Sequence, residues 1–320
     1  MLEVALTRRW PDEVEDLLDQ EFTLHRNTAD DPLNQQQLKT LMEQVDVVGV
    51  TVTDRLDASV FDVPDLRVKL LANFGVGFNH IDLEAAAAAG IAVTNTPGVL
   101  TDCTADLAMT LLLMTARRAG EGERELRSGG WSGWRPTHLL GSRVSGKTLG
   151  IIGAGRIGLA TARRARFGFG MKVLLNSRSE VPAEHLNELQ AEQLPIDELL
   201  QRSDFVSLHA PSSAETFHLI DQRRLALLGP SGILINTARG DLIDEAALTV
   251  TLRSGGIAAA GLDVFEHEPR VPAELLECEN LVALPHMGSG TVETRTAMGM
   301  CALANIRAYA ADERLPDLLT

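Results

Sequence analysis

The chain has 320 residues, 45 % of them hydrophobic, so it can form sizeable cores, and two domains fit this length better than one. Its formal net charge of −15 is spread along the sequence, which argues against nucleic acid or an anionic membrane as a partner, because both favour clustered positive charge. Residues 1–12 lack the basic start of a signal peptide, and no apolar run reaches the ~18 residues needed to cross a bilayer, so we expect a cytoplasmic protein.

The region before about residue 100 predicts a small α/β unit. Apolar runs that favour strands occur at LEVAL (2–6), VDVVGVTV (45–52), LRVKLLAN (66–73) and IAVTNT (91–96). Helix-like patterns lie between them, for example at 12–20 and 81–89. Strands that alternate with helices indicate a parallel sheet.

The middle of the chain contains a long helix pattern and then an irregular stretch. Thr101 and Asp102 can cap a mostly apolar helix that runs to Arg118 and joins the two units. The stretch 120–146 is rich in glycine and holds Trp131 and Trp134. We interpret it as an excursion from the compact fold, an arm toward a second subunit.

From residue 147 onward, six strand-like runs alternate with helical patterns: TLGIIG, MKVLLN, DFVSLHAP, GILINTAR, IAAAGLDVF and NLVALPH. A final helix is expected at 288–311, with Ser289 or Thr291 as its N-cap. Right-handed crossovers would then produce a doubly wound parallel sheet covered by helices on both faces.

The three cysteines, Cys103, Cys278 and Cys301, are odd in number, far apart and placed in apolar runs. We therefore expect neither a disulfide framework nor a metal site.

A glycine-rich motif, GAGRIG, spans 153–158 between a predicted strand at 148–152 and a predicted helix at 156–167. In this context Gly153 makes the tight turn, Gly155 lets the backbone approach a pyrophosphate, and Gly158 allows close packing of helix and strand. The helix N-terminus adds free N–H groups for the phosphates. The alternative is a glycine turn without a ligand, but the strand–glycine–helix order favours a dinucleotide.

The next predicted strand ends in VLLNSRS (173–179), where NAD-binding units carry an acidic residue for the ribose. This chain has Ser177 and Arg178 instead; the serine can donate a hydrogen bond, and the arginine can pair with a 2′-phosphate. We therefore expect NADP(H) to be preferred, with NAD(H) possible. The alternative is that Arg178 is an ordinary solvated surface residue.

Polar residues follow the last three predicted strands. INTARGD places Arg239 after one strand, GLDVFEHEP places Asp263, Glu266 and Glu268 after the next, and ALPHMGSGT places His286 after the last. In open parallel sheets, ligands bind outside the carboxyl ends of the strands. An arginine can hold a carboxylate, a histidine can exchange a proton near neutral pH, and a carboxylate beside the histidine favours its protonated form. Reduction of a 2-keto acid by a nicotinamide cofactor needs this set of groups.

Each of these residues has a plainer alternative. Arg239 could be a structural ion-pair residue, His286 a hydrogen-bonded turn residue, and Glu268 a solvated loop carboxylate; their joint occurrence at strand ends favours catalysis. His209, in SLHAP, is the rival proton donor, although no carboxylate is near it in sequence. His267 lies between two glutamates, but neighbours in an extended chain point to opposite sides.

Four motifs in order, GAGRIG, INTARGDLIDEAAL, AAAGLDVFEHEP and LPHMGSGT, make the sequence resemble the D-isomer-specific 2-hydroxyacid dehydrogenases. ANFGVGFNHIDL and NTPGVLTDCTADLAMTLLL are most similar to the glyoxylate and hydroxypyruvate reductase branch. The resemblance runs from about residue 70 nearly to the end. It implies an α/β protein with a Rossmann-type doubly wound dinucleotide-binding domain at 100–287 and a smaller flavodoxin-like substrate-binding domain at 1–99 and 288–320.

The resemblance also implies roles for individual residues. Arg239 would anchor the keto acid, His286 would protonate the oxygen at C2, and Glu268 would support His286; we refer to these three residues as the catalytic set. The backbone of Val76 and Gly77 would bind the substrate carboxylate. Asp263 would hold the nicotinamide carboxamide. The other implied cofactor-binding positions are Thr104, Gly153, Gly155, Arg156, Ile157, Gly158, Ser177, Arg178, Ala210, Thr237 and Gly288.

The expected reaction is the NADPH-dependent reduction of glyoxylate to glycolate and of hydroxypyruvate to D-glycerate. The alternatives are another D-2-hydroxyacid dehydrogenase, of D-lactate, 3-phosphoglycerate or phosphonate type, and a non-catalytic NAD(P) sensor on the same fold. The resemblance implies a homodimer, in which Trp131 and Trp134 either reach the partner's active site or only anchor the interface. Met287 and Gly290 depart from the family pattern, so the resemblance does not determine the shape of the substrate pocket.

Overall fold

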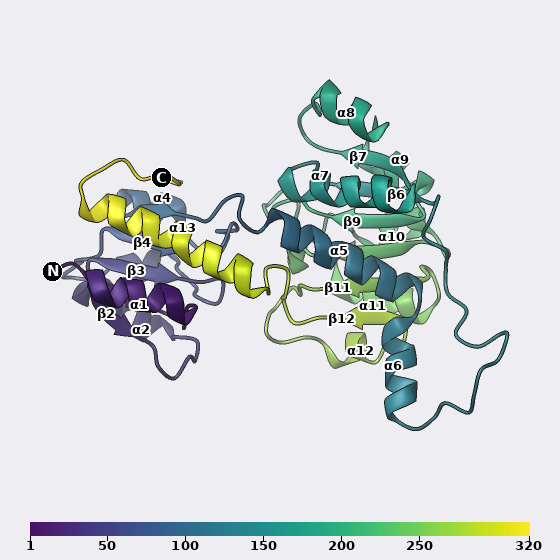
Figure 1. The fold of residues 1–320 in the computed structure, drawn as a ribbon, viewed down its shortest axis with the longest axis horizontal. Helices are drawn as coiled ribbons and strands as arrows, with labels where there is room; N and C mark the ends of the chain where they lie inside the picture. The colour runs from purple at the N-terminus through teal and green to yellow at the C-terminus, as the bar shows by residue number, and fades with distance from the viewer. The chain divides into compact units, whose positions relative to one another are not determined.

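The computed structural model describes all residues from Met1 to Thr320. It divides into two compact units: the first comprises Met1–Leu100 and Ser289–Thr320, and the second comprises Thr101–Gly288. Each unit is built on one parallel β-sheet with helices on both faces (Figure 1).

The first unit contains a five-stranded sheet in the order β2-β1-β3-β4-β5. The strands are β1 (Glu3–Leu6), β2 (Thr23–Arg26), β3 (Val47–Val50), β4 (Leu70–Asn73) and β5 (Ala92–Thr94). All neighbouring strands are parallel, and this order is that of flavodoxin-like sheets, as expected.

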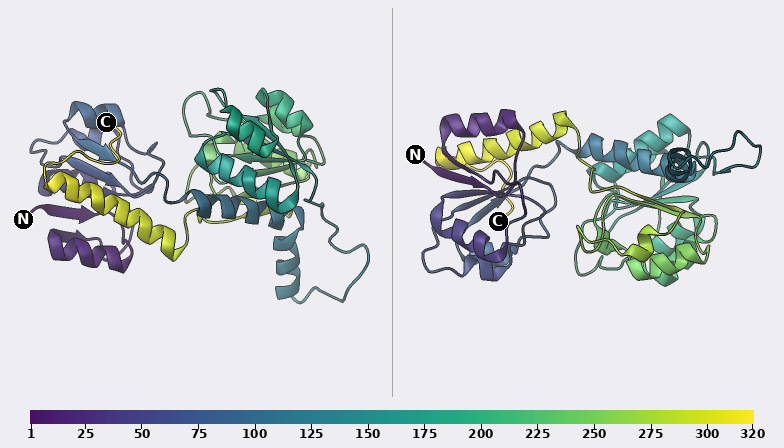
Figure 2. Two further views of the ribbon diagram at one scale, coloured as in Figure 1. Left: turned by 45° about the horizontal axis from the view of Figure 1, so that its top comes forward. Right: turned by 90° about the horizontal axis from the view of Figure 1, so that it is seen from below.

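Helices cover both faces of this sheet. They are α1 (Asp12–Glu21), α2 (Gln35–Gln44), α3 (Ala58–Phe61), α4 (Leu83–Ala88) and α13 (Val292–Ala310). α1 and α13 pack side by side on one face, and α2 to α4 cover the other (Figure 2, right). Close packing of α13 on α1 requires Gly299, because a Cβ atom there would lie 2.7 Å from a methyl group of Val14. The Thr291 side chain accepts the N–H of Thr294, so Thr291 rather than Ser289 caps α13.

The second unit contains a seven-stranded parallel sheet in the order β12-β11-β10-β9-β6-β7-β8. The strands are β6 (Thr148–Ile152), β7 (Lys172–Asn176), β8 (Glu192–Gln193), β9 (Phe205–Leu208), β10 (Ile233–Asn236), β11 (Ala259–Leu262) and β12 (Leu281–Ala283). Counted from β6, this is the doubly wound order of dinucleotide-binding sheets with one strand added. The chain order reverses between β6 and β9, which creates a topological switch point there.

Two hydrophobic cores enclose this sheet. α5 (Thr101–Ala116), α7 (Arg156–Arg163), the π-helical turn η1 (Arg164–Gly168) and α8 (Ala183–Leu189) contribute to one core. α9 (Ile196–Arg202), α10 (Gln222–Leu228), α11 (Glu245–Arg253) and α12 (Ala273–Leu276) contribute to the other, and a short 3-10 turn, η2, spans Gly240–Leu242. All four residues of β9, β10 and β11 are buried, as expected for a parallel sheet covered on both faces.

The stretch 120–146, predicted to be irregular, begins with a helix in the structure. α6 (Ala119–Arg127) forms at its start, and the following residues to 147 have no helix or strand. α6 and this segment project from the second unit (Figure 1). They carry exposed apolar side chains, including Leu126, Trp131 and Trp134, the last of which is 82 % exposed. No helix of the protein is both long enough and apolar enough to cross a membrane.

Candidate active site

The catalytic set lies at the carboxyl ends of three adjacent strands of the second unit. β10, β11 and β12 are neighbours in the sheet and all run parallel. Arg239 follows β10, Glu268 follows β11, and His286 follows β12. The sheet therefore brings together residues that are up to 47 positions apart in the sequence.

A short hydrogen bond joins two members of the set. Nδ1 of His286 lies 2.7 Å from Oε2 of Glu268, and Oε1 of Glu268 accepts the N–H of Phe265 at 2.9 Å. Burial alone would raise the pKa of the Glu268 carboxyl. The hydrogen bond and charge of His286, the Phe265 N–H and the Arg239 guanidinium outweigh burial and hold this pKa below its ordinary value. An ionised carboxylate can only accept hydrogen bonds, so Nδ1 of His286 carries the proton and Nε2 is the ring nitrogen left for proton exchange.

Arg239 is half-buried beside this pair. Burial lowers the pKa of its guanidinium, while the charges of Glu268 and Asp241 favour its charged form. Nη1 donates to the carbonyl of Ala238 at 2.6 Å, and the side chain of Asn236 donates to the Arg239 carbonyl at 2.7 Å. The loop conformation is thus fixed by the last residue of β10.

Asp263 holds the turn that carries His286. It is fully buried, and its two carboxylate oxygens accept the N–H groups of Met287 and Gly288 at 2.7 and 2.8 Å. Burial is the main reason why the pKa of Asp263 is raised, against the two N–H donors and the charge of His286. The backbone of His286 has a left-handed φ of 52°, and its N–H donates to the Asp263 carbonyl at 2.8 Å. The contact of Asp263 with the nicotinamide stays a prediction, and its hydrogen bonds to the turn after His286 were not anticipated.

The glycine motif lies at the switch point, between β6 and α7. Gly153 has a φ of 99°, and a Cβ atom there would lie 2.5 Å from the backbone of His209 and Ala210 after β9. A Cβ atom on Gly158 would lie 2.1 Å from the Gly153 carbonyl oxygen, whereas one on Gly155 would point into open space. No side chain caps the N-terminus of α7. The first glycine therefore makes the turn and, with the third, permits close packing, while the second leaves open space beside the N-terminus of α7, where a pyrophosphate is expected.

The residues expected at the adenosine end lie after β7. Arg178 is 79 % exposed, and its Nη1 lies 3.3 Å from Oε2 of Glu215. The carbonyl of Ser177 accepts a hydrogen bond from the Gln193 side chain at 3.4 Å. Both expectations for Arg178, a phosphate ligand and a solvated surface residue, are compatible with this exposure.

Thr104 and Thr237 lie in buried positions close to these loops. The methyl group of Thr104 would be 3.4 Å from a Cβ atom on Gly288, so α5 packs directly on the turn after His286. The hydroxyl of Thr237 is buried and has no hydrogen-bond partner within the protein. Such an orphaned polar atom is expected where a bound molecule completes the hydrogen bonds.

The other histidines are less suited to donate a proton. His209 is half-buried, and desolvation lowers its pKa to about 3, so it is neutral; its Nε2 lies 2.9 Å from the hydroxyl of Ser207. His267 is 77 % exposed, and its Nε2 lies 3.9 Å from Oε1 of Glu266. Neither histidine has a carboxylate partner as close as that of His286.

Val76 and Gly77 belong to the first unit, in the loop after β4. The Asn73 side chain donates to the carbonyls of Gly75 and Gly77 at 3.0 and 2.9 Å, and the Asn95 side chain donates to the carbonyl of Val76 at 2.9 Å. The N–H groups of Val76 and Gly77 have no acceptor in the protein. Our sequence interpretation missed the two asparagines, although each directly follows or ends a strand, the same signal that pointed to Arg239 and His286.

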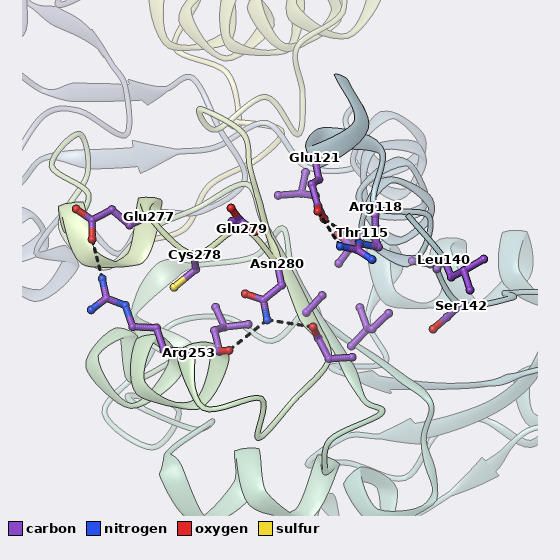
Figure 3. Close-up of a pocket in the computed structure, with 17 residues that line it drawn as sticks. Thr115, Arg118, Glu121, Leu140, Ser142, Arg253, Glu277, Cys278, Glu279 and Asn280 are labelled. Atoms are coloured by element: carbon purple, nitrogen blue, oxygen red, sulfur yellow. Dashed lines mark hydrogen bonds and ion pairs between the residues drawn. The ribbon is translucent and has the colours of Figure 1, made fainter. Parts of the chain in front are cut away.

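A cavity in the second unit lies at the opposite, amino ends of the strands of its sheet. It has a volume of about 570 Å³ and is lined by residues from α5, α6, α11 and the first positions of β10 and β11 (Figure 3). Four of its charged side chains form two ion pairs, Arg118 with Glu121 and Arg253 with Glu277, and Glu279 also lines it. None of the predicted site residues lines this cavity, and no group of three or more potential ligand side chains that could hold a metal ion occurs in the protein.

Comparison with known proteins agrees with these features. The model for the NAD-binding domain of D-isomer specific 2-hydroxyacid dehydrogenases matches residues 109–288. A glyoxylate reductase from Thermococcus onnurineus (strain NA1) is 44 % identical over 320 residues, which cover 99 % of this chain and 95 % of the relative. The chain belongs to the D-isomer-specific 2-hydroxyacid dehydrogenase family.

Two further relatives are similar over nearly their whole length. Glyoxylate/hydroxypyruvate reductase B from Serratia proteamaculans (strain 568) is 41 % identical over 304 residues, which cover 95 % of this chain and 93 % of the relative. The crystal structure of an NADPH-dependent glyoxylate/hydroxypyruvate reductase from Sinorhizobium meliloti, in complex with NADP and malonate, superposes with a TM-score of 0.88 at 34 % identity and covers 100 % of this chain and 97 % of that one. The resemblance seen in the sequence is thereby confirmed, and the protein is an NAD(P)-dependent D-2-hydroxyacid dehydrogenase.

Proposed function

We propose that this dehydrogenase reduces small 2-keto acids with NADPH, chiefly glyoxylate to glycolate and hydroxypyruvate to D-glycerate. The observation that carries the proposal is the 2.7 Å hydrogen bond between His286 and an ionised Glu268, within electrostatic reach of Arg239. The names of the relatives from Thermococcus, Serratia and Sinorhizobium support this substrate class.

The substrate is held by its negative charge. The guanidinium of Arg239 matches the geometry of a carboxylate or keto acid and stays charged at neutral pH. The unpartnered N–H groups of Val76 and Gly77 can donate to the substrate carboxylate, while the asparagine side chains already occupy the carbonyl groups of these two residues. This arrangement recognises an anion without an additional positive charge.

His286 supplies the proton. In the reduction, C2 of the keto acid gains a hydride and its oxygen gains a proton, so the C=O group becomes CH–OH. Nε2 of the protonated imidazole donates this proton, and Glu268 stabilises the imidazolium through Nδ1. General acid catalysis of this kind typically contributes on the order of 10²–10⁴ to the rate.

The residues around the glycine motif fit a nicotinamide dinucleotide, which supplies the hydride when bound. The N–H groups of Arg156 and Ile157 and the open space at Gly155 would receive the pyrophosphate. Thr104, Ala210, Thr237, Asp263 and Gly288 would line the rest of the cofactor site, and the orphaned hydroxyl of Thr237 is available for a hydrogen bond.

NADPH is the proposed cofactor because Ser177 and Arg178 replace the usual acidic residue. To form a charge-assisted pair with a 2′-phosphate, Arg178 would release its ion pair with Glu215. That pair is solvent-exposed and therefore weak. Changing Ser177 and Arg178 together to alanine should lower the ratio of kcat/KM for NADPH to that for NADH. An unchanged ratio would move the source of cofactor preference to other residues.

A panel of keto acids assayed with both cofactors tests the reaction. We expect NADPH oxidation with glyoxylate and hydroxypyruvate; a higher kcat/KM with pyruvate would favour a D-lactate dehydrogenase instead. Binding of NADPH without turnover of any keto acid would favour the alternative of a non-catalytic sensor, since fold and function are separable.

We also propose a homodimer formed through the segment after α5. The exposed side chains of Leu126, Trp131 and Trp134 are of the kind that is enriched at protein interfaces. Light scattering after size-exclusion chromatography should give twice the monomer mass, and Trp134→Ala should weaken the dimer. A monomeric wild-type protein at micromolar concentration would contradict this proposal.

A further inference from the structure

The segment after β11 contains a carboxylate that the catalytic set does not use. Glu266 is largely buried, and its Oε1 lies 3.2 Å from Nε2 of His218. His218 belongs to the segment after β9, and its ring stacks on Phe217 with centroids 3.9 Å apart. The protein thus contains a second carboxylate–imidazole pair, distinct from His286–Glu268.

His218 is fixed to the segment after β10 by its backbone. Its N–H donates to the carbonyl of Asp241 at 2.8 Å, and two residues later Ile220 forms a parallel bridge with Ile243. The hydroxyl of Ser212 donates to the Asp241 carboxylate at 2.5 Å. The segments after β9 and β10 are therefore hydrogen-bonded to each other, and Arg239 belongs to the second of these segments.

Glu266 is fixed from two sides by backbone contacts. Its N–H donates at 2.8 Å to the carboxylate of Glu245, the first residue of α11. On the other side the chain passes directly over Gly240, where a Cβ atom would lie 1.8 Å from the carbonyl carbon of Phe265. The hydrogen bond between the Glu266 side chain and His218 is a third contact. It links the segment after β11 to the segment after β9.

Two features connect this pair with the reaction. Phe265, which precedes Glu266, donates its N–H to Glu268, and Gly240, over which it passes, directly follows Arg239. A shift of the Phe265–Glu266 backbone would therefore move the carboxylate partner of His286 relative to Arg239. Rate is sensitive to displacements of this kind, because a misplacement of about 1 Å can cost roughly 10²-fold.

We propose that His218 and Glu266 are positioning residues for the reduction: their hydrogen bond locks the three strand-end segments together, so that Glu268 and Arg239 keep their relative placement. Neither residue is assigned contact with substrate or cofactor. This inference rests on the proposed function for its kinetic consequence, while the locking itself is a property of the protein without substrate.

The test compares variants of the full-length enzyme. His218→Ala and Glu266→Ala each remove the bond. His218→Gln keeps a donor close to the position of Nε2, because the glutamine amide reaches about as far as the imidazole. His267→Ala is the matched control: it removes an exposed histidine whose Nε2 lies 3.9 Å from the same carboxylate oxygen, but it keeps the His218–Glu266 hydrogen bond. The measurements are kcat and KM for glyoxylate, the Kd for NADPH, and hydrogen exchange of peptides covering residues 263–270.

We expect kcat/KM to fall about 10- to 100-fold in both alanine variants, with the Kd for NADPH within about twofold of wild type. The double alanine variant should be no slower than the slower single variant, because both remove one bond. His218→Gln should recover most of the loss, and His267→Ala should behave as wild type. Hydrogen exchange at 263–270 should accelerate in the alanine variants only.

Three results would each overturn the inference. The first is unchanged hydrogen exchange in the alanine variants, and the second is a loss of activity in the double variant that equals the sum of the free-energy losses of the two single variants. The third is a loss of activity in His218→Ala that His218→Gln does not relieve. If the wild-type enzyme turns over no keto acid, the proposed function fails, and the exchange measurement still decides whether the pair locks the segment.

Discussion

Two strands of the seven-stranded sheet lead into a histidine, and the two surroundings give the imidazoles opposite properties. His209, after β9, meets the Ser207 hydroxyl and the Gly153 turn in a site with little solvent, which keeps it neutral. His286, after β12, faces an ionised carboxylate and remains partly accessible. A position at a strand end therefore does not make a proton donor; a charged partner and access to a ligand are also needed.

The largest effect is expected at His286. His286→Gln removes the proposed proton donor, and kcat for glyoxylate should fall on the order of 10²- to 10⁴-fold with little change in NADPH binding. Steady-state assays and a fluorescence titration of NADPH measure the two quantities. Retention of more than a tenth of the wild-type kcat would transfer the role of general acid to another group.

Among residues that contact His209, substitution of Gly153 should have the largest effect on stability. Gly153→Ala places a Cβ atom 2.5 Å from the His209 backbone at a φ of 99°, so the free energy of unfolding should fall by roughly 2–5 kcal/mol. Gly155→Ala is the control, because its Cβ atom meets no protein atom; it should keep the wild-type Tm and weaken NADPH binding. Equal losses of stability in both variants would contradict the separate roles of the two glycines.

Glu268→Gln should reduce kcat about tenfold, because an amide can still accept from Nδ1 of His286 but a hydrogen bond to a charged partner is stronger by about 1–1.5 kcal/mol. The same variant changes the dependence of stability on pH. The folded-state pKa of Glu268 is lowered, so its contribution is complete above the ordinary value of 4.5 and is lost as pH falls through the folded pKa. Urea unfolding of Glu268→Gln below pH 4.5 should therefore show a weaker acid dependence than wild type.

The smallest effect is expected from His209→Gln, the same substitution as in the first prediction. The glutamine amide can retain the hydrogen bond to Ser207, and the residue takes no part in proton transfer, so kcat should stay within about twofold of wild type. A loss comparable to that of His286→Gln would show that the His209 imidazole takes part in catalysis after all.

Most of the sheet strands could be predicted because their burial requires apolar residues. VVGV of β3 and ILIN of β10 are fully buried. β2 (TLHR) and β8 (EQ) were missed, because each is a short edge strand whose alternate residues are exposed. Polar residues keep such an edge from pairing with another chain, but they also remove the apolar pattern by which a strand is predicted.

The carboxyl ends of the strands also indicated the location of the candidate site, whereas the pairing of Glu268 with His286 was expected only from the family resemblance. Asp263, Glu266 and Glu268 follow the same strand, and spacing alone does not decide which of them meets His286. The path of the chain over Gly240 decides it: Asp263 holds the turn after His286, Glu266 meets His218, and Glu268 meets the imidazole. Contacts between separate segments determine all three partners, and such contacts leave no local pattern in the sequence.

The close approach at Gly240 has a mechanical consequence. With 1.8 Å between the position of a missing Cβ atom and the Phe265 backbone, no side chain fills the space between the segment that carries Arg239 and the one that carries Glu268. Two backbones in direct contact have no intervening rotamers through which one could relax without the other. We therefore expect the separation between Arg239, the proposed substrate anchor, and Glu268, the proposed support of His286, to fluctuate less than if each segment moved independently.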